Sequence, residues 1–427
     1  MIMEATVLNS NFEAIKIIDT FGSFIWTDRY DEAGDFKIYL PITKGLPDGI
    51  QQDYYLWNAN SEHVMIIEKI NIETDAEEIP YCIISGRCLK SILDRRIIWN
   101  HTTFSRDDEN DTDYNLQDAI ELLLKENVIE PAIVARRIPN FIFEKSNDEF
   151  IKSLTIEAQY HGEDLYDTIK KLCQENGIGF KITLEESEKY AQSKLDSGEW
   201  TQNQANAVIA EASHAFIFKL INGTDRSYNQ IERATEFAEK MLRTSKWTQD
   251  EVDTYVNNAT VNENPYVVFA PSFGNILNTS YVESKQTLKN VALVGGEGEG
   301  TERTMYVVGG DNIIGMDRRE IFADANSVSS NTGEDSLTVD QYYAHLKQKG
   351  IDTLIENVAT TAFEGEIDTT RMYKYGEDFF IGDIVQIANE YGQEGVVRVT
   401  EFIMSHEKDG ISTYPTFKTI QEGEYDA

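Results

Sequence analysis

The chain has 427 residues, 41% of them hydrophobic and 11% aromatic, so it can form two to four folded domains and is not intrinsically disordered. Its 74 acidic and 38 basic residues give a net charge of −36, which argues against a DNA binder because such proteins meet the phosphate backbone with Lys and Arg. The sequence has no apolar run long enough to span a membrane and no signal-peptide pattern at its start.

Residues 1–105 are expected to form a β-rich domain. Phe36, Ile38 and Leu40 alternate with more polar residues, which is the period of a half-buried strand. The other elements expected here are strands over 64–72 and 81–85 and a short helix over 89–98. A polar segment, 102–113, is expected to mark the end of this domain.

Residues 106–275 predict a mixed α/β middle domain. Asn115 is a candidate N-cap for a helix with the apolar stripe Ala119, Leu122 and Leu123. The further elements expected are a helix over 165–174 and strands over 179–184 and 216–220.

Two stretches of the middle domain resemble each other. Trp200-Thr-Gln and Trp247-Thr-Gln each follow a polar helical stretch, and each Thr stands three residues before Gln204 or Glu251, the spacing of a capping box. The pattern predicts two helical hairpins, about 188–212 and 232–260, that project from the middle domain as insertions.

Residues 276–427 are again β-rich. Strands are expected over 291–294, 305–308, 358–367, 381–388, 396–406 and 413–420, with a connector before the first of them. One helix, capped by Thr338 with Gln341 three residues on, crosses between them.

None of the motifs weighed for chemistry predicts a catalytic, cofactor or metal site. The run Gly295–Gly300 lacks the Lys-Ser/Thr of a phosphate loop, and Glu297 and Glu299 would repel phosphate, which favours a tight turn. The acidic run 107–113 lacks the Gly and Glu of a calcium loop. The six histidines show no zinc spacing, and Cys82, Cys88 and Cys173 are expected to be reduced, buried thiols.

A set of motifs follows in order within the segment from about residue 24 to about residue 417. They are Trp26–Tyr30, Gly34–Pro41, Ser85–Arg96, Gly223–Ser227, Ser272–Leu277, Ser280–Glu283 and Asn290–Arg303. This set resembles the tail-hub proteins of long-tailed bacteriophages (baseplate hub or tail tip), among them the siphophage Gp37-like tail proteins. The resemblance rests chiefly on Trp26, Asp28, Gly34, Gly86, Asp225, Arg226, Gly295, Gly298, Glu299 and Arg303, which it implies are structural.

The resemblance implies an α+β fold with two tube-type β-barrel domains, 1–105 and 276–427, flanking the middle domain. It implies a homotrimer that closes the tail tube at the virion's host-facing tip and gates DNA ejection. The partners implied are the distal tail ring, the tail tube, the tape-measure protein and receptor-binding or tip proteins. The protein would be made in the cytoplasm of the host bacterium and would be no enzyme.

Other functions are compatible with an acidic, β-rich chain. One is a cell-wall-degrading or carbohydrate-active tail enzyme, which a zymogram on host cell walls would reveal. Another is a monomeric carbohydrate-binding module with exposed aromatic platforms. Charge alone also fits any soluble acidic protein, although a wall that repels DNA suits a conduit through which DNA must slide.

Overall fold

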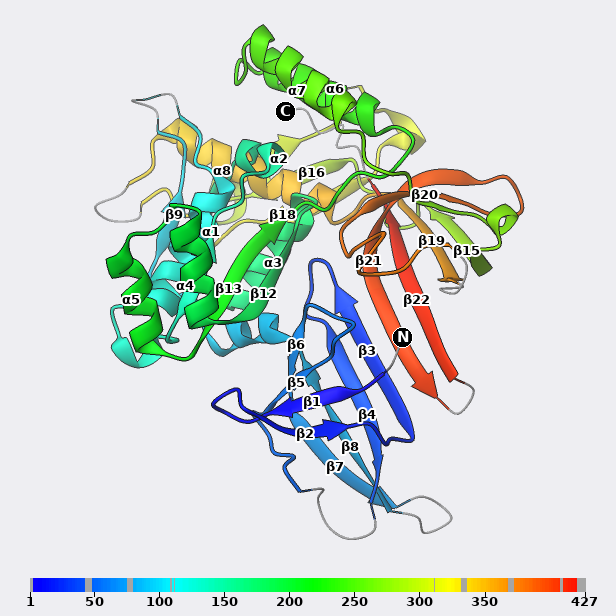
Figure 1. Ribbon diagram of the computed structural model, residues 1–427. Helices are drawn as coiled ribbons and strands as arrows, with labels where there is room; N and C mark the ends of the chain where they lie inside the picture. Colours follow the sequence, from blue (N-terminus) through cyan, green and yellow to red (C-terminus); the bar gives the residue numbers. More distant parts are fainter. Residues whose placement is uncertain are drawn as a thin grey trace.

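The structure is a computed structural model that describes residues 3–42, 48–74, 80–107, 110, 112–310, 312–331, 336–367, 372–407 and 410–420. Strands outnumber helices, and the predicted mixture of the two is confirmed (Figure 1). None of the helices in these ranges is long and apolar enough to cross a lipid bilayer.

The largest element is a ten-stranded sheet built from both ends of the chain (Figure 1). Its main path runs through β15 (Ile276–Ser284), β19 (Thr360–Ile367), β22 (Gly410–Thr419), β21 (Glu394–Glu407), β3 (Ser23–Arg29), β4 (Asp35–Pro41), β8 (Pro80–Arg87) and β7 (Lys69–Thr74). Two further strands lie off this path: β20 (Ile384–Ala388) pairs with β21 and with β14 (Val268–Phe269). The β-rich ends of the sequence therefore form one sheet rather than two separate ones.

The two ends meet where β3 pairs with β21. The antiparallel register places Trp26 opposite Met404 and Asp28 opposite Phe402, and all four side chains are buried on one face of the sheet. A slip of one residue would turn these side chains out of the core, so the hydrophobic pattern fixes the register.

A four-stranded sheet lies beside the first strands of the main sheet. Its order is β2 (Ala14–Ile18), β1 (Ala5–Leu8), β5 (Tyr55–Trp57) and β6 (Val64–Ile66). A close approach joins the two layers, because the backbone of Gly86 on β8 lies against the carbonyl of Ile66. The strand expected over 64–72 is thus two strands, β6 and β7, in different sheets.

The middle region packs helices on a three-stranded sheet. The sheet has the order β10 (Phe141–Glu144), β13 (His214–Ile221) and β12 (Gly179–Glu186). The strands β9 (Thr102–Phe104) and β11 (Ala158–Tyr160) form a separate two-stranded sheet, so the expected boundary at 102–113 begins with a strand. The helices are α1 (Leu116–Leu124), α2 (Glu149–Ser153), α3 (Leu165–Glu175), α4 (Ser187–Asp196), α5 (Gln202–Glu211), α6 (Gln230–Arg243) and α7 (Gln249–Val261).

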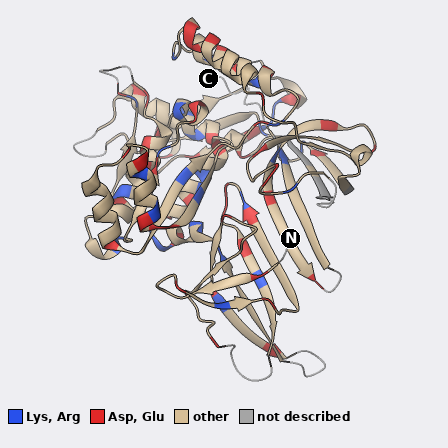
Figure 2. Ribbon diagram, viewed as in Figure 1, with Lys and Arg blue, Asp and Glu red and all other residues tan. Residues whose placement is uncertain are grey.

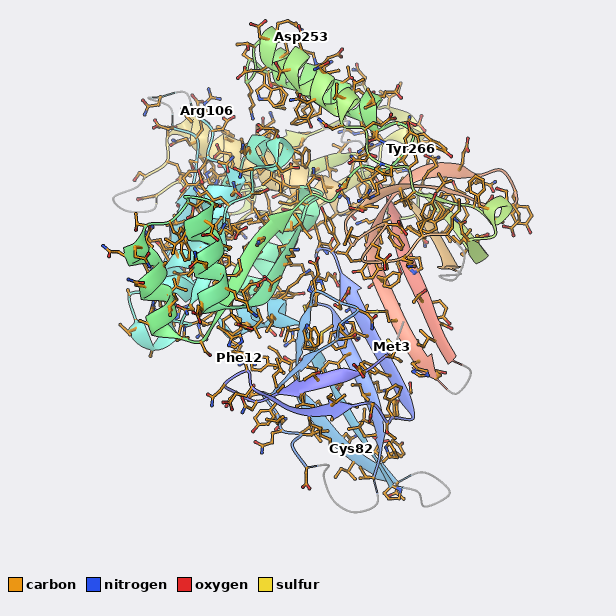
Figure 3. The ribbon with its side chains drawn as sticks, viewed as in Figure 1. Met3, Phe12, Cys82, Arg106, Asp253 and Tyr266 are labelled. Carbon is orange, nitrogen blue, oxygen red and sulfur yellow. The ribbon has the colours of Figure 1, made fainter. Side chains whose placement is uncertain are left out.

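Both expected helical hairpins are present, as α4–α5 and α6–α7. Thr201 and Thr248 each form the predicted capping box, with Gln204 and Glu251. The hairpin α6–α7 lies at one edge of the molecule, and Asp253 lies on α7 (Figures 1 and 3). The hairpin α4–α5 packs on the three-stranded sheet, where Tyr190 is buried against residues of β13.

Residues 285–358, here called the inserted unit, lie between β15 and β19. They form a three-stranded sheet, β17 (Met305–Val308), β16 (Val291–Gly295) and β18 (Glu320–Asp324), covered on one face by α8 (Val339–Ile355). Thr338 and Gln341 make the predicted capping box of α8. The buried apolar side chains of this unit form a core of their own, separate from the large core of the rest of the chain.

The predicted pair of closed barrels is not confirmed. In the part of the chain that the structure describes, the main sheet is open, with β7 and β15 at its two edges. The sequence also predicted a connector where the nine-residue strand β15 stands. The short helix expected over 89–98 is a 3₁₀ helix, Leu89–Arg95.

Candidate functional site

A buried polar junction, here called the junction, joins the main sheet, the middle region and the loop before β20. Asp28 on β3 is fully buried and accepts hydrogen bonds from Trp26 Nε1 at 3.1 Å, Ser61 Oγ at 2.7 Å and Tyr375 OH at 3.0 Å. Burial raises the pKa of Asp28 to about 6, and the hydrogen bonds act against this rise. The predicted site residues Trp26 and Asp28 therefore lie together, and Asp28 connects β3 to Ser61 and Tyr375.

Tyr30, at the end of β3, connects the junction to the middle region. Its hydroxyl donates to the carbonyl of Ile221 at 2.9 Å, and the guanidinium of Arg398 lies 4.9 Å from its ring centroid. Arg398 also donates to the carbonyl of Gly382 at 2.7 Å. Gly179 and Gly382 both touch the Tyr30 ring so closely that a Cβ at either position would overlap it.

Lys90 holds the turn that follows β3. Its Nζ is completely buried and donates to three carbonyls, those of Arg29 at 2.8 Å, Tyr30 at 2.9 Å and Glu32 at 2.8 Å. Burial lowers the pKa of Lys90. All three donors of the ammonium are used, so its role is to satisfy backbone carbonyls that would otherwise be buried without partners.

Gly34 and Gly86 lie where strands approach most closely. A Cβ at Gly34 would overlap the carbonyl oxygen of Thr27, and a Cβ at Gly86 would overlap that of Ile66. Both glycines have ordinary backbone angles, so the reason for Gly at these positions is space rather than conformation.

Asp225 and Arg226 are neighbours in the sequence but bond to different partners. Arg226 Nε bonds Asp383 Oδ2 at 2.8 Å, whereas Asp225 Oδ2 accepts from Arg233 Nε at 3.0 Å. Asp225 forms a bridge with Ile384, and neighbouring side chains of an extended segment point in opposite directions. Asp383 also accepts from Thr224 N at 2.8 Å, so this pair of segments ties the middle region to β20.

The remaining predicted site residues lie apart from the junction, in the inserted unit. Arg303 donates to the carbonyls of Gly295 and Gly296 and to Asp324 in the same chain. Gly298 has φ +101°, which favours Gly, and Glu299 is exposed. These contacts support a tight turn rather than a phosphate loop. Arg303 and Arg318 each pair with a carboxylate of their own chain, Asp324 and Glu320.

One Ser–His contact resembles part of a hydrolase site. Ser105 Oγ lies 2.6 Å from His345 Nε2, and Glu157 Oε2 lies 3.4 Å from the same nitrogen. A catalytic triad needs the carboxylate on the other ring nitrogen, where it orients the base. His345 is 2% exposed, and burial lowers its pKa to about 4. The geometry is that of a buried contact rather than that of a catalytic triad.

Metal binding and cysteine reactivity are the other kinds of chemistry to consider among the described residues. No group of three or more His, Cys, Asp or Glu side chains among them is placed to hold a metal ion. The three cysteines are free and buried, and burial raises the pKa of Cys173, which disfavours a thiolate.

Several residues of the junction were not singled out in the sequence. Tyr30 and Lys90 both lie within quoted motifs, so attention to every member of a motif would have found them. Tyr375, Asp383 and Arg398 carry no local signal, because their bonds to Asp28, Arg226 and Tyr30 each join residues more than 150 positions apart.

Comparisons with known proteins agree with the motifs. The chain resembles solved tail proteins at 10–11% identity. A prophage MuSo2 43 kDa tail protein from Shewanella oneidensis has 10% identity and TM-score 0.52, covering 97% of this chain and 98% of that one. The prophage tail protein gp18 from Listeria monocytogenes has 10% identity and TM-score 0.49 (99% and 96% covered). A tail protein from Neisseria meningitidis has 11% identity and TM-score 0.49 (99% and 97% covered).

The first of these structures shares the fold of this chain. None of the curated proteins matches the sequence. The family model described as "Siphovirus ReqiPepy6 Gp37-like protein" matches residues 4–417. The chain therefore belongs to the Siphovirus ReqiPepy6 Gp37-like protein family, as its ordered motifs predict.

Proposed function

We propose that this phage tail protein is a trimeric hub that closes the tail tube at the host-facing tip of the virion. In this proposal, residues 1–105 and 276–427 supply the ring, and the middle region, 106–275, carries the helical hairpins. The distal tail ring and the tail tube bind on one side, and receptor-binding or tip proteins bind on the other. The tape-measure protein and DNA pass through the opened ring.

The observation that supports a ring is the open main sheet with its two unpaired edges. β7 and β15 end a path of eight strands, and in the described residues neither pairs with a further strand. Exposed edges promote pairing with another chain, and a head-to-tail contact closes into a ring when the rotation permits. Pairing β7 of one copy with β15 of the next would complete the tube-type barrel from several subunits, since one chain alone leaves it open.

The charges of the main sheet suit a passage for DNA. On the face opposite the core, Arg29 bonds Asp35 at 2.5 Å and Glu401 at 2.6 Å, so its charge is neutralised within the chain. Lys and Arg lie among acidic residues along these strands (Figure 2). Together with the net charge of −36, this favours weak contact with a phosphate backbone.

The experiment is to measure the native mass of the purified protein and of edge variants, with and without the distal tail protein. The expected mass is three times 48.6 kDa. Ile72 on β7 and Val282 on β15 are exposed, and a Lys at either position should block pairing of the edges and yield monomers. Ile17→Lys is the matched control, because Ile17 is an exposed residue on β2, outside the main sheet. A monomer that persists with its tail partners would refute the ring.

A further inference from the structure

The inserted unit is attached to the rest of the chain by a two-stranded ribbon. It enters from β15 and leaves into β19, and these strands pair with each other, with Ser284 opposite Thr360. The ribbon continues to the edge of the unit, where Lys289 N donates to the carbonyl of Asn357 at 2.6 Å. Because the entry and exit segments lie side by side and the unit has its own core, it can rotate as a body on this tether without unfolding.

The inserted unit docks on the middle region mainly through polar contacts. Gln159 on β11 exchanges two hydrogen bonds of 3.0 Å with the backbone of Ser329. Gln341 on α8 donates to the carbonyl of Arg106, which Figure 3 shows beside α8. The buried Ser105–His345 contact lies in the same interface. Polar interfaces within a chain are the kind that permit relative motion of domains.

The far end of this interface holds more negative than positive charge. Glu175 on α3 faces Asp352 and Glu356 on α8, and its side chain is 8% exposed. Lys171 Nζ lies 2.6 Å from Glu356 Oε1 and 3.5 Å from Glu175 Oε1. Glu175 Oε1 accepts no hydrogen bond from any residue that the structure describes. The other groups that face this cluster are Tyr160 from β11 and Lys349 and Gln348 from α8.

Burial and mutual repulsion shift the pKa values of these carboxylates. The pKa of Glu175 is raised to about 8, first by burial and then by Asp352, and burial also raises that of Asp352. Docking of the unit therefore favours the form of this pair in which the two carboxylates share one proton. Undocking would expose Glu175 and Asp352 to water, return their pKa values to the ordinary range and release that proton.

We propose that the inserted unit is a hinged domain, which stays docked on α3 while the Glu175–Asp352 pair holds a proton and swings out on its ribbon when both carboxylates ionise. This goes beyond the proposed function, because it requires no ring and no partner. It assigns to the 285–358 segment a closed and an open position governed by the pH around the virion.

The direction of the effect follows from the two kinds of titrating group. Docking binds a proton at Glu175 between its ordinary pKa of 4.5 and the docked value of about 8, so docking weakens as pH rises through this window. His345 has the opposite effect below pH 6.5. Its pKa is about 4 when the unit is docked and returns to about 6.5 when the unit undocks, so a fall in pH below 6.5 favours the undocked, protonated imidazole. Above pH 6.5 the carboxylates act alone, and opening is expected between pH 6.5 and 8.

The histidines of the chain supply a direct test. Diethyl pyrocarbonate modifies exposed, neutral imidazole, and peptide mass mapping gives the rate at each histidine of the intact protein. His345 is 2% exposed when the unit is docked, His101 is exposed, and His63 is buried in the main body. The rate at His345 relative to His101 is expected to rise about tenfold from pH 6.5 to pH 8. Below the docked pKa of Glu175, each unit of pH changes the docking equilibrium by about a factor of ten. His63 should remain unreactive.

Two variants and one control test the cause. Glu175→Gln removes the repulsion, so His345 should stay protected at both pH values, whereas Lys171→Met removes the nearest cation and should expose His345 at both. Asp340→Asn changes an exposed carboxylate of α8 and should behave as the wild type.

Three results would overturn the proposal. The first is equal protection of His345 in the wild type at the two pH values. The second is an unchanged pH response in Glu175→Gln. The third is parallel reactivity of His63, which would indicate loosening of the whole fold. The wild-type measurement alone is decisive if a variant fails to fold.

Discussion

The junction around Asp28 and Lys90 differs from the contact between α3 and α8 in how its buried charges are satisfied. At the junction, every donor of Lys90 has a carbonyl within 2.9 Å, and Asp28 accepts from three side chains. Between α3 and α8, three carboxylates share the nearby Lys171, and one buried oxygen of Glu175 accepts no hydrogen bond from the described residues.

The difference shows how one chain can be rigid at the junction and able to move at the α3–α8 contact. Buried polar groups that are fully satisfied favour a single arrangement, whereas partly satisfied ones cost free energy in the docked state. The junction therefore fixes the two ends of the chain as one sheet, and the α3–α8 contact leaves the inserted unit free to move.

The largest effect is expected at the junction. Lys90→Met leaves three buried carbonyls without a donor and should lower the free energy of unfolding by about 3–5 kcal/mol. Chemical denaturation measures this. Lys189→Met, at a side chain that is 75% exposed, is the matched control and should change stability little. If both variants lose the same small amount, the junction is not the rigid part of the molecule.

The ionisation of Asp28 should make the free energy of unfolding depend on pH, with an effect of similar or smaller size. Because its pKa in the folded protein, about 6, lies above the ordinary 3.8, its contribution to stability is present below pH 3.8 and lost as pH rises through 6. The shift of about two units corresponds to about 3 kcal/mol. The wild type should therefore lose that much, relative to Asp28→Asn, between pH 3.5 and 7. Parallel pH profiles of the two proteins would contradict the pKa assignment.

The helical hairpins should show a smaller effect. Thr248→Ala and Thr201→Ala each remove a capping box and should destabilise their helix by about 0.5–2 kcal/mol. The loss at Thr201 should appear in global unfolding, because α4–α5 is packed on β13, while the loss at Thr248 should appear chiefly as local hydrogen exchange in α7. Thr254→Ala, an exposed position inside α7, is the control.

The smallest effect concerns hydrolysis at the Ser105–His345 contact, where no catalytic activity is expected. Because Ser105 and Glu157 meet the same nitrogen of His345, a zymogram on bacterial cell walls should show no hydrolysis, with or without added zinc, calcium or magnesium. Clearing that disappears in Ser105→Ala, while the fold is kept, would convert this docking contact into an active site.

The sequence predicted those features whose causes are local. The capping boxes at Thr201, Thr248 and Thr338 each depend on residues three apart, and all three are present. The period of two at Phe36–Leu40 likewise marks β4. Such signals need no knowledge of the rest of the chain.

What the sequence could not predict depends on pairing over long distances. β15 carries the run Asn-Thr-Ser, which is weak as a strand signal, and it forms because β19 supplies a partner about 80 residues later. Arg226 likewise bonds Asp383, 157 residues away, and this contact depends on the approach of the segment before β20. The joining of both ends in one sheet has the same origin.

The pairing of β3 with β21 also bears on how the protein is made. Arg29 and Glu401, which bond across these strands, are 372 residues apart in the chain. At about 5–20 residues per second on the ribosome, β3 must wait roughly 20–70 s for its partner to be synthesised. During that time its edge, with Phe24 and Trp26, is open to other nascent chains. An unpaired strand edge of this kind makes the incomplete chain prone to aggregate until β21 has been synthesised.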